Sequence, residues 1–252
     1  MEEERRLLRP PAIGAGVGPQ LYDRVRAELA AFADAPEPVR IDPGFDLVDM
    51  PPRQSPSGGP IRVLLLGRME DRGVKGLDLA AKALAEATRI HELDPSTLEL
   101  VLRGVPEAEF DEIRTAVLDW AGARLRVTTR SYTVGCDEWE YDLRRAVLLL
   151  MPSRAEGFGM AGLEAIVAGT PVLISDRSGL GELIREVAPS EARQIVVPIK
   201  DDARDLQTWG TAIAAVLTNP AEAFARAETL RRVMAERRSW SQAAQAILAA
   251  TA

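Results

Sequence analysis

The sequence predicts an α/β fold built on a doubly wound parallel sheet, in a single main domain with a helical C-terminus. From residue 61 onward, short β-branched or Leu-rich runs alternate with segments of helical period, which is typical of parallel strands joined by crossover helices. The predicted strands are apolar almost throughout, as expected for strands buried on both faces. The chain has 252 residues and is 46% hydrophobic, enough to build such a core without disulfides or metals.

Strands and helices are expected in alternation along this domain. In the helix predicted for 76–90, Leu77, Ala80 and Leu84 repeat at intervals of three and four, and the helix over 110–120 follows the same period. After Asp205 the chain becomes helical, and a last amphipathic helix follows Trp240. The predicted strands are 62–66, 98–103, 125–129, 147–151, 172–175 and 195–197.

Residues 1–60 differ in composition from the rest of the chain. An amphipathic helix is expected at about residues 19–32, followed by the short segment VRIDPGFD and a stretch rich in Pro, Gly and Ser at 51–60. We therefore predict two parts. Residues 1–60 hold an N-terminal helix, the remainder of a preceding domain and a linker, and residues 61–252 form the sheet domain with C-terminal helices.

Composition excludes several classes of protein. A net charge of −7 argues against a nucleic-acid binder, which usually carries clustered cations. The single cysteine, Cys136, cannot form an internal disulfide, and no N-terminal segment resembles a signal peptide. The longest apolar run, AVLLLMP, is far below the roughly twenty residues of a membrane span. We expect a cytoplasmic protein without a membrane span, metal site or cofactor.

The segment from Val147 to Ser175 carries the most chemistry. A buried strand runs into a loop containing Gly157 and Gly159, and the helix beginning near Met160 directs unpaired N–H groups at that loop. This geometry favours binding of an anion such as a phosphate. Two carboxylates, Glu156 and Glu164, bracket the loop and could accept hydrogen bonds from hydroxyl groups. An isolated Glu164 would otherwise be interpreted as a capping or salt-bridging residue of the helix.

A second group of polar residues follows the first predicted strand. In GRMEDRGVK, Arg68, Arg72 and Lys75 gather after Gly67 at the carboxyl end of a strand, the edge where open α/β sheets bind ligands. A guanidinium and an ammonium there could neutralise a diphosphate. The alternative is a set of solvated loop charges without a ligand.

The segment EGFGMAGLE, with MPSRA before it and AGTPVL after it, resembles the E-x7-E signature of retaining glycosyltransferases that have two Rossmann-like domains. The resemblance implies that Glu156 contacts the donor hexose, that Glu164 contacts the ribose, and that the amides of Phe158, Gly159 and Met160 contact sugar and phosphate. The family also has Arg and Lys after the first strand, which Arg68 and Lys75 match with about two extra residues between them.

The resemblance implies that the sheet domain is a Rossmann-like nucleotide-sugar-binding domain. It implies a UDP-, GDP- or ADP-hexose donor and catalytic roles for Arg68, Lys75 and Glu156. The wider donor site would comprise Gly67, Arg68, Lys75, Tyr132, Glu156, Gly157, Phe158, Gly159, Met160 and Glu164. Tyr132 is a candidate for stacking on the base, and Arg103 also ends a strand, whereas Glu182 and His91 are expected to be structural.

The N-terminal acceptor domain of such enzymes is not expected within residues 1–60. The predicted partner is therefore an acceptor domain in cis or in trans, and the chain alone is expected to be inactive. The alternative function is a binding or sensing module that keeps the nucleotide-sugar pocket without catalysis.

Overall fold

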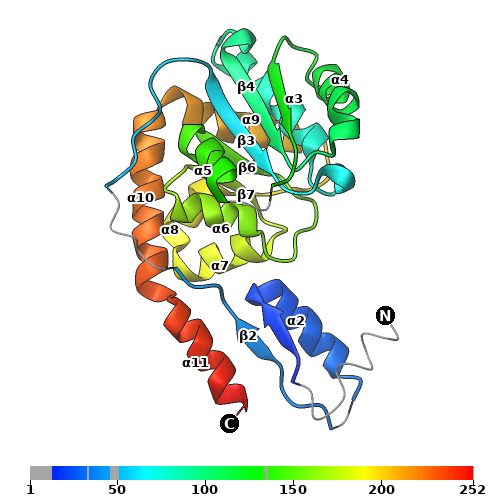
Figure 1. Cartoon of the computed structure of the whole chain (residues 1–252), viewed down its shortest axis with the longest axis vertical. Coiled ribbons are helices and arrows are strands. Elements are labelled where there is room, and N and C mark those ends of the chain that lie inside the picture. Colours follow the sequence, from blue (N-terminus) through cyan, green and yellow to red (C-terminus); the bar gives the residue numbers. More distant parts are fainter. Residues whose placement is uncertain (1–12, 33, 46–50, 134–135, 252) are drawn as a thin grey trace.

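The computed structural model describes residues 13–32, 34–45, 51–133 and 136–251 (Figure 1). Its centre is a parallel sheet of six strands in the order β5-β4-β3-β6-β7-β8. The predicted Rossmann-like α/β fold is therefore confirmed. The strands are β3 (Ile61–Leu66), β4 (Leu98–Arg103), β5 (Arg126–Arg130), β6 (Leu148–Met151), β7 (Val172–Ser175) and β8 (Val196–Val197).

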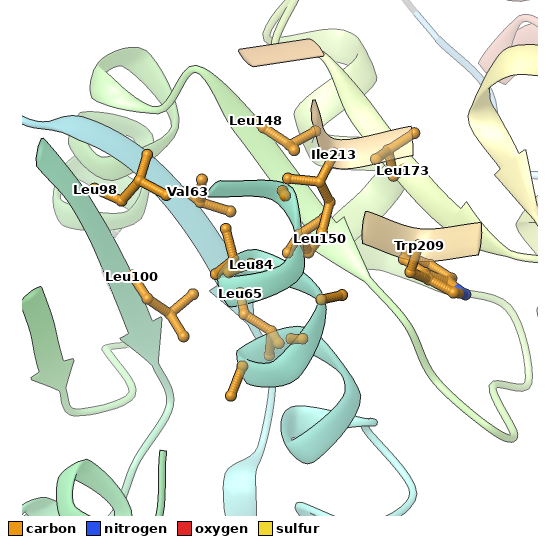
Figure 2. Close-up of a cluster of buried hydrophobic side chains, with 14 of the residues drawn as sticks. Val63, Leu65, Leu84, Leu98, Leu100, Leu148, Leu150, Leu173, Trp209 and Ile213 are labelled. Carbon is orange, nitrogen blue, oxygen red and sulfur yellow. The ribbon is translucent and has the colours of Figure 1, made fainter. Parts of the chain in front are cut away.

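Helices cover both faces of this sheet because alternate strand residues are apolar on both sides. Val63 and Leu65 of β3 pack with one group of helices, whereas Leu64 between them packs with the other. The first group is α3 (Leu77–Ile90), α4 (Phe110–Ala121) and α9 (Arg204–Thr218). The second includes α6 (Met160–Val167), α7 (Gly179–Val187), α8 (Pro189–Ile195) and α10 (Pro220–Arg237). Figure 2 shows the first cluster, in which Trp209 is fully buried.

The strands lie within one residue of the predicted positions, but β5 is not the apolar strand that was expected. It reads RVTTR, and most of its residues are only partly buried. Its position explains the difference, because β5 is an edge strand of the sheet and pairs with β4 alone. An edge strand has one neighbour and keeps polar residues.

The chain order creates a switch point in the middle of the sheet. From β3 the chain moves outward through β4 to β5, and then returns so that β6 pairs with the other side of β3. The connections that follow β3 and β6 therefore leave in opposite directions, which opens a crevice beyond the carboxyl ends of these two strands. Ligands of open α/β sheets bind in such crevices.

Described residues between 15 and 41 fold as a small β-α-β unit. Strands β1 (Ala15–Val17) and β2 (Val39–Ile41) pair in parallel, and α2 (Gly18–Leu29) connects them. Gln20 on α2 donates a hydrogen bond to Glu182 on α7 at 2.9 Å, and Arg40 pairs with Glu186 on the same helix. The predicted N-terminal helix therefore forms part of a unit that is docked on the sheet domain.

The last helix, α11 (Trp240–Thr251), leaves the sheet domain and lies beside β2 (Figure 1). The amide of Phe45 donates to the carbonyl of Arg238 at 2.9 Å. A side chain at Gly44 would lie 2.1 Å from the backbone nitrogen of Trp240, so the two backbones meet at that point. In space, α11 therefore belongs with the N-terminal unit, whereas the sequence grouped it with residues 61–252.

The Pro-rich stretch has no helix or strand from 51 to 60, but Arg53 attaches it to the domain. Its guanidinium donates to the carbonyls of Leu143 and Arg144 and lies 5.4 Å from the ring centroid of Phe224. Burial and the charge of Arg144 lower the pKa of Arg53 to about 10, which leaves it protonated at neutral pH. Among the helices that the structure describes, none is long and apolar enough to cross a membrane.

Candidate functional site

A cavity of about 810 Å³ lies at the carboxyl ends of β3 and β6, and we call it the switch-point cavity. Every residue predicted for the donor site lines it, from Gly67, Arg68 and Lys75 on one side to the segment 156–160 and Glu164 on the other. Tyr132 lines it as well. The two polar groups found in the sequence therefore face one space. Leu21, Arg103 and Trp139 also line the cavity.

The tip of α6 closes one side of the switch-point cavity. Gly159 caps the helix with a φ of 110°, a conformation that residues with a side chain rarely adopt. No side chain caps the helix, and the amides of Met160 and Ala161 make no hydrogen bond with the residues that the structure describes. These amides and the positive end of the helix dipole form a site suited to an anion.

Lys75 and Glu156 form an ion pair across the cavity, with 2.6 Å between Nζ and Oε2. They are 81 positions apart in the sequence, and both side chains are more than three-quarters buried. The short helix η1 (Met69–Asp71) absorbs the extra residues of the loop and buries Met69. Lys75 consequently reaches the site despite its unusual spacing from Arg68.

Arg68 and Arg72 belong to the same loop but have different surroundings. Arg68 lines the cavity, is exposed, and has no ion pair or side-chain hydrogen bond with the described residues. Arg72 instead pairs with Glu112 on α4 at 2.7 Å and does not line the cavity. The structure thus brings two of the three predicted cations to the site and assigns Arg72 to a surface ion pair.

A salt bridge that the sequence did not reveal joins the two sides of the site. Arg154 donates to both carboxylate oxygens of Asp78, at 2.7 and 2.9 Å, and to the carbonyl of Gly73. Burial alone would raise the pKa of Asp78, but the hydrogen bonds and charge of Arg154 outweigh burial and lower it. Arg154 precedes Glu156 and Asp78 follows Lys75, so the pair holds the two loops together.

Glu164 lies in the first turns of α6. Its carboxylate makes no ion pair or side-chain hydrogen bond with the described residues, and burial raises its pKa. A half-buried, unpaired carboxylate that lines a cavity can accept hydrogen bonds from hydroxyl groups of a ligand.

The remaining predicted residues have clear positions. The side chain of Tyr132 is 68% exposed, so this ring lies at the rim of the cavity. Glu182 accepts the hydrogen bond from Gln20, and His91 ends α3, in keeping with structural roles. Trp139 was missed because it sits in an acidic helix, and Leu21 because the helix that carries it was assigned to a separate part of the chain. No group of three potential metal ligands occurs among the described residues.

The fold is similar to that of solved glycosyltransferases. Staphylococcus aureus TarM, in a complex that includes UDP, superposes with a TM-score of 0.69 at 16% identity, covering 93% of this chain and 43% of TarM. At that identity the likeness concerns the fold. The sheet, its switch point and the C-terminal helices therefore resemble the fold of part of that glycosyltransferase.

Sequence comparison gives the family. Over residues 1–247 the chain matches the family GT4-conflict, described as family 4 glycosyltransferases in conflict systems, and the chain belongs to that family. It is 31% identical over 197 residues to glycogen synthase of Mycobacterium tuberculosis, covering 76% of this chain and 42% of the synthase. It is 30% identical over 264 positions to D-inositol 3-phosphate glycosyltransferase 1 of Catenulispora acidiphila, covering 91% of this chain and 61% of that enzyme. The chain spans about half the length of these relatives.

Proposed function

We propose that the switch-point cavity binds a nucleoside-diphosphate sugar as the donor half of a retaining glycosyltransferase. The observation that carries this proposal is the meeting of Arg68, Lys75 and the α6 tip in one cavity that also contains Glu156 and Glu164. Two cations and a helix N-terminus suit a diphosphate. Two carboxylates suit the hydroxyl groups on either side of it. The UDP in the TarM complex is of the same ligand class.

The chemistry assigned to the residues is mainly electrostatic. When the glycosidic bond breaks, negative charge accumulates on the departing diphosphate, and Arg68, Lys75 and the amides near Met160 stabilise it. The diphosphate competes with Glu156 for Lys75, whose Nζ lies 2.6 Å from Oε2 of Glu156. Releasing Glu156 leaves its carboxylate to orient the hexose. Glu164 holds the ribose.

An acceptor domain supplied in cis or in trans would complete the enzyme, since the relatives are about twice as long as this chain. The same observation favours a second candidate, a module that binds or senses the nucleotide-sugar without transferring the sugar. Release of the nucleoside diphosphate from a nucleotide-sugar, measured for the chain alone and together with a candidate acceptor domain, is the readout that separates the two. Turnover by this chain alone would reject the sensing module.

Binding of a nucleoside diphosphate or its hexose conjugate is expected to raise the melting temperature. A ligand at 100 times its Kd stabilises the folded state by about 2.7 kcal/mol, because it binds that state alone. A thermal-shift panel of UDP, GDP, ADP and their hexose conjugates at millimolar concentration identifies the base. If none of them shifts the melting temperature, the proposed function is wrong.

Affinity for the nucleotide-sugar is expected to fall as the pH decreases through the raised pKa of Glu164. The ionised carboxylate is the form that accepts ribose hydroxyls, and burial makes protonation occur at a higher pH than for an exposed Glu. The loss should approach about 1.5–3 kcal/mol at the acidic limit, the value of a hydrogen bond to a charged group. Calorimetric titration from neutral to acidic pH measures it, and a nucleotide-sugar has no phosphate that titrates in this range.

The control for this pH dependence is Glu164→Gln, which keeps the shape of the side chain and cannot ionise. We expect its affinity to be low and nearly constant with pH. Equal pH dependence in the variant and the wild type would mean that another group titrates, and an unchanged affinity at neutral pH would make Glu164 a structural residue.

A further inference from the structure

Arg103 is a buried cation at the carboxyl end of β4 that borders the switch-point cavity and, unlike Arg68, is held by protein partners. Its side chain is only 3% exposed. A buried charge requires a partner, and Nε donates to Oδ2 of Asp142 at 2.6 Å. Asp142 on α5 (Cys136–Arg145) is 5% exposed and also pairs with Arg130 at 2.7 Å through its other oxygen. The three side chains form a network between β4, β5 and α5.

The other end of the Arg103 guanidinium reaches a wall of the cavity. Nη1 lies 3.2 Å from the carbonyl oxygen of Ser131, 3.2 Å from Oγ1 of Thr133 and 3.3 Å from a carboxylate oxygen of Glu138. Ser131 and Glu138 directly precede Tyr132 and Trp139 in the chain, and Thr133 lines the cavity itself. We call Tyr132, Thr133 and Trp139, which all line the cavity, the aromatic wall.

We propose that Arg103 is a positioning residue that fixes the aromatic wall against which the nucleobase of the donor stacks. The inference rests on the proposed function and assigns the base end of the cavity. Nε and Nη1 are both engaged by protein acceptors, so Arg103 acts through the wall and leaves the diphosphate to Arg68 and Lys75. Trp139, which is half-buried, provides the larger ring surface, whereas Tyr132 is largely exposed.

The geometry requires arginine at this position. The planar guanidinium presents Nε to Asp142 and Nη1 to the loop at the same time. Lysine has one compact ammonium group and cannot bridge both sets of acceptors. Arg103→Lys should therefore behave like Arg103→Met in ligand binding, although it retains the charge.

The test is a double-mutant cycle in the affinity for the nucleoside diphosphate that binds the wild type best. Arg103→Met and Trp139→Leu should each weaken binding by about five- to tenfold, the size of a base–aromatic stacking contribution. If Arg103 acts through the wall, the double variant loses no more than Trp139→Leu alone. Combined with Arg68→Ala, the effect of Arg103→Met should instead multiply, because the two residues serve different parts of the ligand.

Arg130→Met is the matched control, because it removes the other arginine from the same carboxylate of Asp142 and does not border the cavity. Its affinity should change less than about twofold. If Arg103→Met does not fold, Thr133→Val replaces it in the cycle, because it removes a wall acceptor without leaving a buried charge.

Two outcomes would overturn the inference: losses that multiply for Arg103 and Trp139, or a loss from Arg103→Met that disappears in the Arg68→Ala background. The first would mean that Arg103 supports the whole domain, and the second that it binds the diphosphate. Failure of the wild type to bind any nucleoside diphosphate would instead overturn the proposed function. The two results are therefore distinguishable.

Discussion

Arg68→Ala is expected to weaken the binding of a nucleoside diphosphate by roughly 10- to 100-fold. Hydrogen bonds to charged groups contribute about 1.5–3 kcal/mol each, and a guanidinium can contact two phosphate oxygens at once. Arg68 has no ion pair with the described residues, so removing it leaves no protein group without a partner. The whole effect should appear in ligand affinity, measured by titration calorimetry, and the melting temperature of the free protein should be nearly unchanged.

The same loop provides the control for this prediction. Arg72→Ala removes an equal charge four residues away, but Arg72 pairs with Glu112 and does not line the cavity. We expect its affinity to fall less than about threefold, since a distant exposed charge is screened by salt. Equal losses for the two variants would show that the loop acts through its general positive potential, and the specific role of Arg68 would be wrong.

Gly76→Ala is expected to destabilise the fold by at least about 3 kcal/mol and to abolish nucleotide binding. Gly76 has a φ of 69°, and an added Cβ would lie 2.0 Å from the carbonyl oxygen of Pro152. The left-handed conformation costs alanine about 1–2 kcal/mol, and the clash with a backbone atom adds to it. Relief requires the loops after β3 and β6 to separate, which would pull Lys75 away from Glu156.

Gly122→Ala separates the conformational cost from the cost of the clash. Gly122, at the end of α4, has a similar φ of 59°, but no atom lies within 4 Å of a Cβ added there. It should cost only the conformational part, about 1–2 kcal/mol, and leave binding intact. Urea unfolding of both variants gives the difference in the free energy of unfolding. Equal values would mean that the loops adjust to the clash, and that the contact at Gly76 does not fix the cavity.

The length of the chain relative to its relatives gives these measurements a practical advantage. Glycogen synthase of M. tuberculosis is matched over 42% of its length, and the matched region covers 76% of this chain. Binding and stability can be measured on this chain without an acceptor. Transfer assays additionally require a candidate acceptor domain, and the proposed function does not depend on finding one.

The N-terminal unit contributes to the wall of the switch-point cavity. Leu21 of α2 lines the cavity, and its side-chain carbons would lie 3.2 Å from a Cβ added at Gly157. Gly18 likewise leaves room for the ring of Phe158, which would be 2.4 Å from an added Cβ. Glycines at these two positions therefore let α2 and the loop before α6 approach closely. Through Leu21, α2 is therefore part of the wall of the site.

Much of this protein could be predicted from local patterns in the sequence. Apolar runs and helical periods placed the six strands of the central sheet within one residue, because a buried strand or an amphipathic helix is determined by near neighbours. Strands β1 and β2 of the N-terminal unit were not predicted. The loop at 156–160 could be predicted from the sequence for the same reason as the central strands. Its glycines, its flanking strand and its following helix are contiguous, and the resemblance of this segment led to the family that the comparison confirmed.

The tertiary structure alone decided which distant residues meet. Lys75 and Glu156 pair although they are 81 positions apart. This pairing depends on β6 lying beside β3, whereas chain order alone would place β6 beside β5. The bridges Arg154–Asp78 and Arg103–Asp142, and the packing of α11 beside β2, depend equally on strand order and helix direction. A pattern of apolar and polar residues specifies which face of an element is buried, but not which neighbour covers it, because many neighbours bury the same apolar area equally well.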